Sequence, residues 1–204
     1  MILASQSPRR RELLEEAGFS LEVLPADIDE TRLPDEAPET LVGRLAREKA
    51  EATRLLLKGS TTDPLLVAAD TIVWTDDGEV LGKPADADDA RRMLEGLSGR
   101  VHHVSTGVCV MLLSPAASVE KTTSFVETTD VEFYPLTSGE IRAYADSGEP
   151  LDKAGAYGIQ DRGRLLVHGI RGDYFNVVGL PVARFVREMG RLTGSDATLG
   201  PLGG

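Results

Sequence analysis

Residues 65–73 read LLVAADTIV and predict the central strand of the fold. A segment this apolar is typical of a strand that is buried on both faces of a sheet. Asp70 and Thr71 interrupt the apolar run, and a carboxylate there is costly to desolvate unless a metal, a cation or several donors contact it. An isolated Asp70 would be interpreted as a satisfied buried residue at a turn. Charged residues gather on both sides of this strand, however, so we expect a site.

The bulk composition limits the class of protein. The chain has 204 residues, a formal net charge of −11, 41% hydrophobic and 27% charged residues, which is typical of a globular protein with one core or two small lobes around a cleft. The acidic balance argues against a nucleic-acid binder. No apolar stretch is long enough to cross a membrane, and the N-terminus is the reverse of a signal peptide. The single cysteine, Cys109, lies in an apolar run, and we expect a buried thiol in a cytoplasmic protein.

The N-terminal segment predicts a short strand at residues 2–4 and then a helix from Pro8 to about Ala17, with Ser7 as N-cap. The first turn of this helix carries three arginines, residues 9–11, where each cation is unfavourable by roughly 0.3–1 kcal/mol. Such a turn is expected to meet an anion, and helix N-termini already bind phosphate. The alternative is a solvated helix in which Arg11 pairs with a glutamate of the same helix.

Three further segments hold charged candidates. The loop at residues 27–32 reads DIDETR and is as readily a solvated loop as a site for a metal or water, because hard divalent cations prefer carboxylate oxygens. Residues 40–58 have apolar side chains at helical spacing and predict an amphipathic helix. Lys49 lies near its middle, where a lysine is most often a surface residue. Lys83 lies between a glycine and a proline, which restrict the backbone in opposite ways.

The rest of the chain predicts alternating strands and helices. The expected elements are a strand at 21–24, a hairpin turn at 76–78, helices at 86–97, 137–147 and 181–192, and strands at 101–113, 121–133 and 165–170. Residues 148–160 read GEPLDKAGAYGIQ, lack periodicity, and predict a long loop that brings the backbone close to a ligand. His102 and His103 are adjacent in a strand and point to opposite faces, so we do not expect them to share a metal.

Five motifs, in order, resemble the Maf family of nucleoside triphosphate pyrophosphatases: SQSPRRRELL, AADTIV, GKP, LSGR and EPLDKAGAYGIQ. They cover nearly the whole chain up to about Leu192. The resemblance implies an α/β fold, in which an elongated, bent mixed sheet with flanking helices surrounds a cleft, related to the inosine triphosphate pyrophosphatases. It implies one domain at residues 1–192 with two lobes, followed by a tail at 193–204 that we expect to be disordered. It also implies a cytoplasmic homodimer that needs Mg²⁺ or Mn²⁺.

The resemblance assigns roles to individual residues. Asp70 falls on the proposed catalytic acid/base of the family. The positions linked to base selection in the dTTP/UTP subgroup are Arg9, Thr71 and Gln160. The other active-site positions are Ser5, Arg10, Glu30, Lys49 and Lys83.

These roles are chemically consistent with release of pyrophosphate from a nucleotide. Arg10, Lys49 and Lys83 would neutralise the phosphates. Glu30 and Asp70 would bind the metal and orient or deprotonate the attacking water, and the sequence does not separate the base from the metal ligand. Lys153 is a secondary candidate for the phosphates, with a structural ion pair to a neighbouring acid as an equal alternative.

We therefore expect an enzyme that hydrolyses dTTP and UTP, and modified pyrimidine nucleotides as further candidates, to the monophosphate and pyrophosphate. Its expected partners are the nucleoside triphosphate and a second copy of the chain, with no nucleic acid or membrane. Two alternatives stay open: the subgroup of the same family that prefers 7-methyl-GTP, and a non-catalytic regulator of septum formation. The variant Asp70→Asn separates enzyme from regulator, because it should abolish turnover and leave binding surfaces intact.

Overall fold

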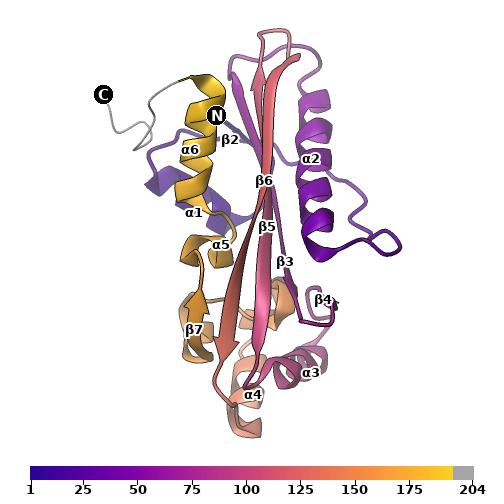
Figure 1. Cartoon of the computed structure of the whole chain (residues 1–204), viewed down its shortest axis with the longest axis vertical. Coiled ribbons are helices and arrows are strands. Elements are labelled where there is room, and N and C mark those ends of the chain that lie inside the picture. Colours follow the sequence, from indigo (N-terminus) through magenta and orange to yellow (C-terminus); the bar gives the residue numbers. More distant parts are fainter. Residues whose placement is uncertain (195–204) are drawn as a thin grey trace. The chain divides into compact units, whose positions relative to one another are not determined.

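A computed structural model of the chain describes residues 1–194 and shows strands alternating with helices, which confirms the predicted α/β class (Figure 1). The chain forms two compact units. Unit 1 comprises Met1–Asp70, Thr106–Glu127 and, within the described part of the chain, residues 179–194, and unit 2 comprises Thr71–Ser105 and Thr128–Val178. Of the predicted tail, residues 195–204 lie outside the described part of the chain.

Seven strands form one mixed sheet in the order β2-β1-β3-β5-β6-β7, with β4 paired to β3. The strands are β1 (Ile2–Leu3), β2 (Glu22–Val23), β3 (Leu65–Trp74), β4 (Val80–Leu81), β5 (Val101–Leu113), β6 (Val119–Phe133) and β7 (Val167–Arg171). β1 lies parallel to both β2 and β3, whereas β4 and β7 are antiparallel to their partners. The predicted central strand is therefore confirmed as β3, and the chain passes from unit 1 to unit 2 between its residues Asp70 and Thr71.

In unit 1, α2 (Pro38–Leu56) lies on one side of the strands, and α1 (Pro8–Glu16) and α6 (Val182–Thr193) lie on the other (Figure 1). Ala46 and Ala50 of α2 are fully buried in an apolar cluster with residues of β1, β3 and β5. These small side chains let the helix approach the sheet closely. α2 begins at residue 38, two residues before its predicted start, because a proline suits the first helical position.

A glycine makes the closest approach between α2 and β5 possible. A Cβ atom on Gly107 would lie 2.2 Å from the carbonyl oxygen of Val42, so no other residue fits there. Cys109 lies nearby on β5 and is a buried free thiol, as predicted, and its burial raises the pKa of the thiol.

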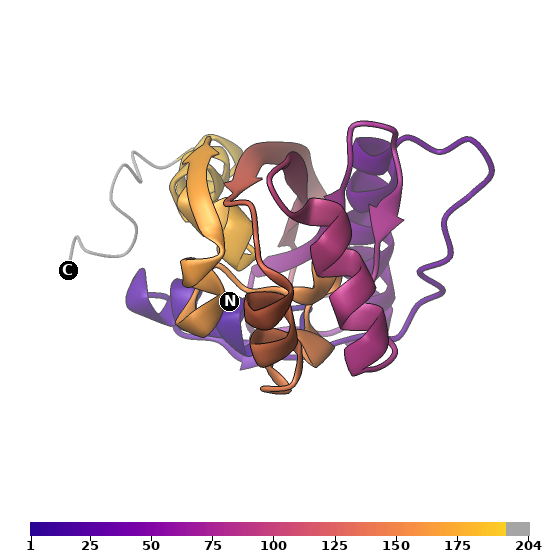
Figure 2. The ribbon, with the colours of Figure 1, turned by 90° about the horizontal axis from the view of Figure 1, so that it is seen from below.

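In unit 2, α3 (Ala87–Leu97) and α4 (Ser138–Ala145) lie side by side (Figure 2). The predicted long loop at 148–160 is wrong in part, because it folds into the 3-10 helices η1 (Glu149–Asp152) and η2 (Ala154–Ala156). A third, η3 (Asp161–Leu165), occupies the predicted start of β7 and delays that strand by two residues. These turns are too short to show periodicity in the sequence.

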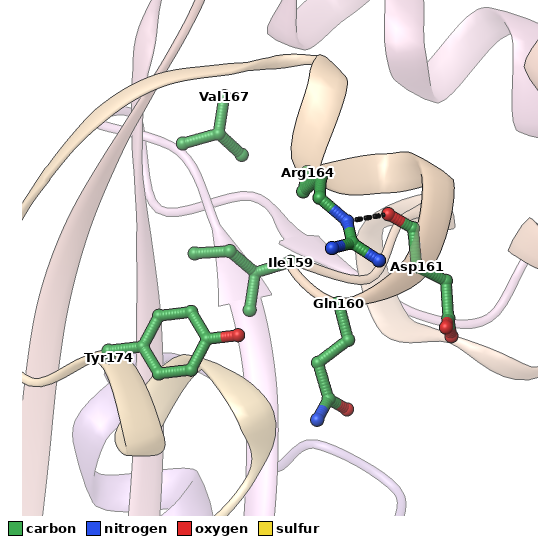
Figure 3. A pocket seen from close by; sticks show the side chains of 6 residues that line it. All are labelled: Ile159, Gln160, Asp161, Arg164, Val167 and Tyr174. Atoms are coloured by element: carbon green, nitrogen blue, oxygen red, sulfur yellow. Dashed lines mark hydrogen bonds between the residues drawn. The ribbon is translucent and has the colours of Figure 1, made fainter.

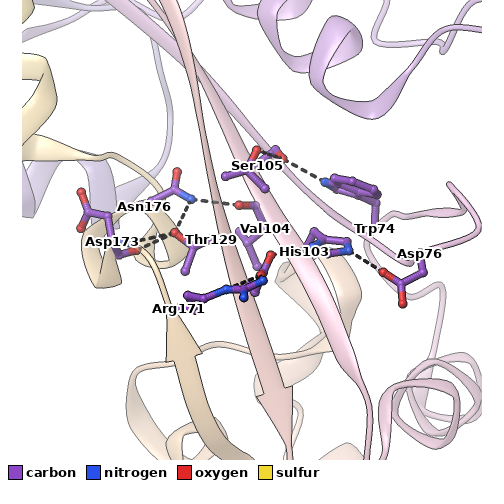
Figure 4. A network of polar contacts seen from close by, with 11 residues as sticks. Trp74, Asp76, His103, Val104, Ser105, Thr129, Arg171, Asp173 and Asn176 are labelled. Carbon is purple, nitrogen blue, oxygen red and sulfur yellow. Dashed lines mark hydrogen bonds and ion pairs between the residues drawn. The ribbon is translucent and has the colours of Figure 1, made fainter.

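The short helix α5 (Tyr174–Val178), which the sequence did not predict, is fixed by hydrogen bonds in unit 2 (Figure 4). Asn176 is fully buried, and its amide donates to the carbonyl oxygen of Val104 at 2.9 Å and to Thr129 Oγ1 at 3.0 Å. Thr129 Oγ1 also accepts from the backbone N–H of Asp173. The position of α5, and of the side chains that it presents, is therefore set by buried polar contacts.

The two adjacent histidines do point to opposite faces of β5. The Nε2 atom of His102 lies 2.8 Å from the Tyr157 hydroxyl in the core of unit 2. The ring of His103 instead lies between Asp130 and Asp76, each 2.8 Å away (Figure 4). None of the helices described is long and apolar enough to span a membrane.

Candidate active site

Two carboxylates of unit 1 share the ammonium group of Lys49. Its Nζ atom lies 2.6 Å from Asp70 Oδ1 and 2.6 Å from Glu30 Oε1. The side chains of Lys49 and Asp70 are 14% and 10% exposed, whereas that of Glu30 is 59% exposed. The cation that the buried strand carboxylate required is therefore Lys49, and Glu30 lies on the solvent side of it.

The register of α2 places Lys49 next to the strand. Ala46 and Ala50 face the sheet, and Lys49 is one residue from the second of them, so it borders the buried stripe of the helix. The long aliphatic stem of the lysine then carries its ammonium group to Asp70. The pattern-based expectation of an ordinary surface lysine is wrong, because Lys49 is largely buried against an acid.

Ser5 and Arg10 form a second polar pair in unit 1. Arg10 is 9% exposed, and its guanidinium donates to the Gly179 carbonyl oxygen at 2.9 Å and to Ser5 Oγ at 3.0 Å. Burial lowers the pKa of Arg10, and the nearby charges of Asp70 and Glu30 oppose this shift. The local cause of this placement is the Ser7 cap, whose hydroxyl accepts from the backbone N–H of Arg10.

The other two arginines of this turn have different surroundings. The side chain of Arg11 is 60% exposed, and its Nε atom lies 2.7 Å from Glu15 Oε1. The solvated alternative is therefore correct for Arg11. Arg9 is half-buried beside Arg10 and contributes to the lowered pKa of that group.

The candidates of unit 2 include Gln160, which lines an open pocket of about 500 Å³ (Figure 3). The lining residues are Ile159, Gln160, Asp161, Arg164, Val167 and Tyr174. Ile159, Val167 and the ring of Tyr174 supply the apolar part of the lining, and Asp161 and Arg164 supply charged groups. Gln160 adds an amide with both donors and an acceptor.

Thr71, Lys83 and Lys153 complete the candidates of unit 2. Thr71 is half-buried on β3, directly after Asp70. Lys83 is exposed and has no ion pair with another residue in the described range 1–194. Lys153 donates to Asp152 Oδ1 and to the Glu149 carbonyl oxygen, both at 2.6 Å, which is the structural ion pair considered as its alternative role.

Sequence reasoning missed two groups that the structure places at these sites. Tyr174 lines the pocket because it lies on α5. This helix has only five residues, too few to show a helical period in the sequence. Glu36 and Arg44 form a bidentate ion pair that connects the segment at residues 27–36, called here the acidic loop, to α2. The signal for this pair is weak in the sequence, because the two residues lie in different elements and each is common on surfaces.

Glu30 and Asp70 are the residues suited to a divalent metal. No cluster of at least three His, Cys, Asp or Glu side chains that could hold a metal occurs in the described part of the chain. Two carboxylates still fit Mg²⁺ or Mn²⁺, because such ions are often held by one or two carboxylates together with substrate phosphates and water. These two carboxylates would therefore hold such an ion only together with phosphate oxygens and water.

Comparison with known proteins gives a consistent result. The family model described as Maf-like protein matches residues 1–192. A dTTP/UTP pyrophosphatase of Anaeromyxobacter dehalogenans (strain 2CP-1 / ATCC BAA-258) is 53% identical over 183 residues, which are 90% of this chain and 89% of that protein. A dTTP/UTP pyrophosphatase of Bacillus cereus (strain G9842) is 47% identical over 189 residues, or 93% of each chain. A solved structure of the Staphylococcus aureus Ham1 protein matches 65% of this chain and 70% of its own, at 13% identity and a TM-score of 0.39.

Proposed function

This chain belongs to the Maf family, and we propose that it hydrolyses dTTP and UTP to the corresponding monophosphate and pyrophosphate. Two relatives at 53% and 47% identity, both named dTTP/UTP pyrophosphatase, support the substrate. The observation that carries the reaction is the position of Lys49 between Asp70 and Glu30. The negative charges of the same two carboxylates also favour the charged form of the nearby Arg10 guanidinium.

The first requirement of this reaction is a positioned water molecule. Asp70 is nearly buried and held by Lys49, so its carboxylate has a fixed place from which to orient a water and accept its proton. We assign Asp70 the role of acid/base on this ground. Glu30 is more exposed, and it is the second carboxylate that contacts Lys49, on the solvent side of Asp70.

The second requirement is to offset the charge of the triphosphate. Lys49 and Arg10 are cations of unit 1, and charge-assisted hydrogen bonds from such groups to phosphate oxygens are strong. Ser5 holds Arg10 by accepting a hydrogen bond from its guanidinium. We assign Lys83, exposed in unit 2, to the same task. Mg²⁺ or Mn²⁺, held by Glu30 and Asp70, would supply further charge stabilisation of the leaving pyrophosphate.

The third requirement is recognition of the base. We assign it to Gln160 and Thr71, whose short polar groups suit the edge of a pyrimidine, and to Arg9. The ring of Tyr174 in the pocket with Gln160 offers a face on which a base can stack.

The test is pyrophosphate release from dTTP, UTP, CTP, GTP and 7-methyl-GTP, with Mg²⁺ or Mn²⁺, by the wild type and by Asp70→Asn. Turnover confined to dTTP and UTP, and reduced about 10²–10⁴-fold in the variant, supports the proposal. Asp146→Asn is the matched control, because Asp146 is a half-exposed surface acid paired with Arg91. Turnover on 7-methyl-GTP alone overturns the base assignment, and no turnover on any nucleotide favours a regulator of septum formation.

We also propose that the protein acts in the cytoplasm as a homodimer, without nucleic acid or membrane partners. The single cysteine and the acidic charge support the location and the absence of nucleic acid. Light scattering of the purified protein tests the dimer, and a monomeric mass at micromolar concentration contradicts it.

A further inference from the structure

We propose that Arg44 and Glu36 are positioning residues for Glu30. They form an ion pair, called here the loop clamp, that fixes the acidic loop on α2 and so sets where the Glu30 carboxylate lies. The inference rests on the proposed function in one respect only, namely that Glu30 serves as a metal ligand there.

The loop clamp is bidentate and largely buried. Arg44 Nε donates to Glu36 Oε1 at 2.8 Å, and Nη2 donates to Glu36 Oε2 at 2.9 Å. The side chains of Arg44 and Glu36 are 17% and 4% exposed. Two parallel bonds from a guanidinium fix orientation as well as distance. The guanidinium also lowers the pKa of Glu36 to about 2, so the carboxylate stays ionised at neutral and mildly acidic pH.

The same guanidinium holds the backbone next to Glu30. Arg44 Nη2 donates to the carbonyl oxygen of Thr31, the residue that follows Glu30, at 3.0 Å. Arg44 and Lys49 both belong to α2, five positions apart. One helix therefore contacts the loop twice, through Arg44 at the Thr31 carbonyl oxygen and through Lys49 Nζ at the Glu30 carboxylate, 2.6 Å away. The distance from Glu30 to Lys49 is therefore set in part by Arg44.

Glu36 organises the rest of the loop. Its Oε2 atom accepts from the backbone N–H of Leu33 at 3.1 Å, and its carbonyl oxygen accepts from Arg32 Nε at 2.8 Å. Almost every residue from 27 to 35 is exposed, and Leu33 is 53% exposed, so apolar packing does little to order this segment. Its order depends instead on polar contacts to Glu36 and Arg44.

The Glu30–Lys49 pair alone would not hold the loop. The side chain of Glu30 is 59% exposed, and ion pairs at such sites are weak and screened by salt. Without the loop clamp, the carboxylate of Glu30 would spend much of its time away from Lys49 and Asp70. A ligand that must be ordered at each binding event binds a metal less tightly.

The first measurement is hydrogen exchange of the protein without nucleotide or metal, in the wild type, Arg44→Met and Glu36→Gln. The expected result is faster exchange in residues 29–37 of both variants and unchanged exchange in the core strand β3. The control is Arg54→Met, because Arg54 also makes a bidentate ion pair on α2, with Glu51, but does not contact the loop. Unchanged loop exchange in Arg44→Met overturns the clamp, whatever the activity of the protein is.

The second measurement is the Mn²⁺ concentration that gives half-maximal pyrophosphate release. We expect it to rise about 10–100-fold in Arg44→Met and Glu36→Gln, as for other residues that position a metal ligand, while kcat at saturating Mn²⁺ changes less. Arg44→Lys keeps the charge without the bidentate geometry and should lie between.

A double variant separates positioning from general destabilisation. In a Glu30→Gln background, Arg44→Met should have little further effect on the Mn²⁺ requirement, because it acts through a carboxylate that is already absent. An undiminished effect in that background overturns the positioning role. Faster hydrogen exchange in the loop of the variants, together with no pyrophosphate release by any variant or by the wild type, would instead reject the proposed function and support the loop clamp.

Discussion

Lys49 Nζ lies 2.6 Å from Asp70 Oδ1, and this contact joins the longest helix of unit 1 to its central strand. Both side chains are largely withdrawn from water, so each charge depends on the other. The same ammonium group contacts Glu30, which makes it the centre of the candidate site. Its loss should therefore be visible in stability as well as in activity.

We expect Lys49→Met to lower the free energy of unfolding by about 1–3 kcal/mol, because Asp70 is left as a buried acceptor without its partner. The double variant Lys49→Met/Asp70→Asn should recover part of this loss, although it is inactive. Urea unfolding monitored by circular dichroism measures both values. A single variant as stable as the wild type would show that Asp70 is satisfied by other groups.

Arg10→Ala should weaken triphosphate binding by about 1.5–3 kcal/mol, the range for hydrogen bonds to a charged group. This corresponds to a rise in KM for dTTP of roughly tenfold or more. Arg10→Lys should be intermediate, because it keeps the charge and loses the planar fork that contacts Ser5. The neighbouring Arg11→Ala is the control, because Arg11 is exposed and paired with Glu15. Equal KM values for the two alanine variants would remove Arg10 from the site.

Features governed by neighbouring residues could be predicted from the sequence. The Ser7 cap of α1 occurs where the sequence predicts it, and the capping box of Thr137 and Glu140 at α4 follows from the same kind of local pattern. The hairpin after β3 and the buried state of Asp70 were also predictable, because turn chemistry and apolar runs are local signals.

Features that depend on contacts between distant segments could not be predicted in this way. Lys49 looked like a surface lysine because the sequence pattern of α2 does not reveal which strand lies next to the edge of its buried stripe. Tyr174 lines its pocket only because the buried amide of Asn176 fixes α5. The loop clamp of Arg44 and Glu36 likewise needs the folded loop to bring its two members together. These contacts join residues that are far apart in the sequence, and no local pattern in the sequence indicates which of them meet.

Tyr174→Leu should raise KM for dTTP about fivefold or more with a small change in kcat, since base stacking on an aromatic ring is worth about 1–3 kcal/mol. Tyr174→Phe keeps the ring and should behave like the wild type. Tyr134→Leu is the control, because Tyr134 is a similarly exposed aromatic residue that packs against His168 and does not line the pocket. Steady-state kinetics with dTTP and UTP measure these values, and an unchanged KM in Tyr174→Leu would exclude stacking.

The last prediction concerns the response of stability to pH and the buried ring of His102. This ring is fully buried, lies edge-to-face against Phe133 and Tyr157, and has Nε2 at 2.8 Å from the Tyr157 hydroxyl. Burial, with a smaller effect of neighbouring His103, lowers the pKa of His102 to about 4. The unfolded chain takes up this proton at its ordinary pKa near 6.5, and the folded chain does so only near 4.

Stability should therefore fall as the pH drops from about 6.5 to about 4, because the unfolded state binds more protons throughout that window. The shift corresponds to an effect of about 3 kcal/mol from this one group. His103 has a raised pKa, because the hydrogen bonds that its ring donates to Asp76 and Asp130 outweigh its burial, and its effect on stability therefore has the opposite sign and falls at and above pH 6.5. Comparison of variants isolates the part due to His102.

His102→Gln should be less stable than the wild type at pH 7.5, and the difference should shrink as the pH falls through this window. Urea unfolding at pH 7.5, 6, 5 and 4.5 measures the two curves. His168→Gln is the control for removing an imidazole at a half-exposed position, beside Glu132. If the curves of His102→Gln and the wild type are parallel instead, His102 does not titrate with unfolding, and the acid sensitivity of the fold comes from its carboxylates.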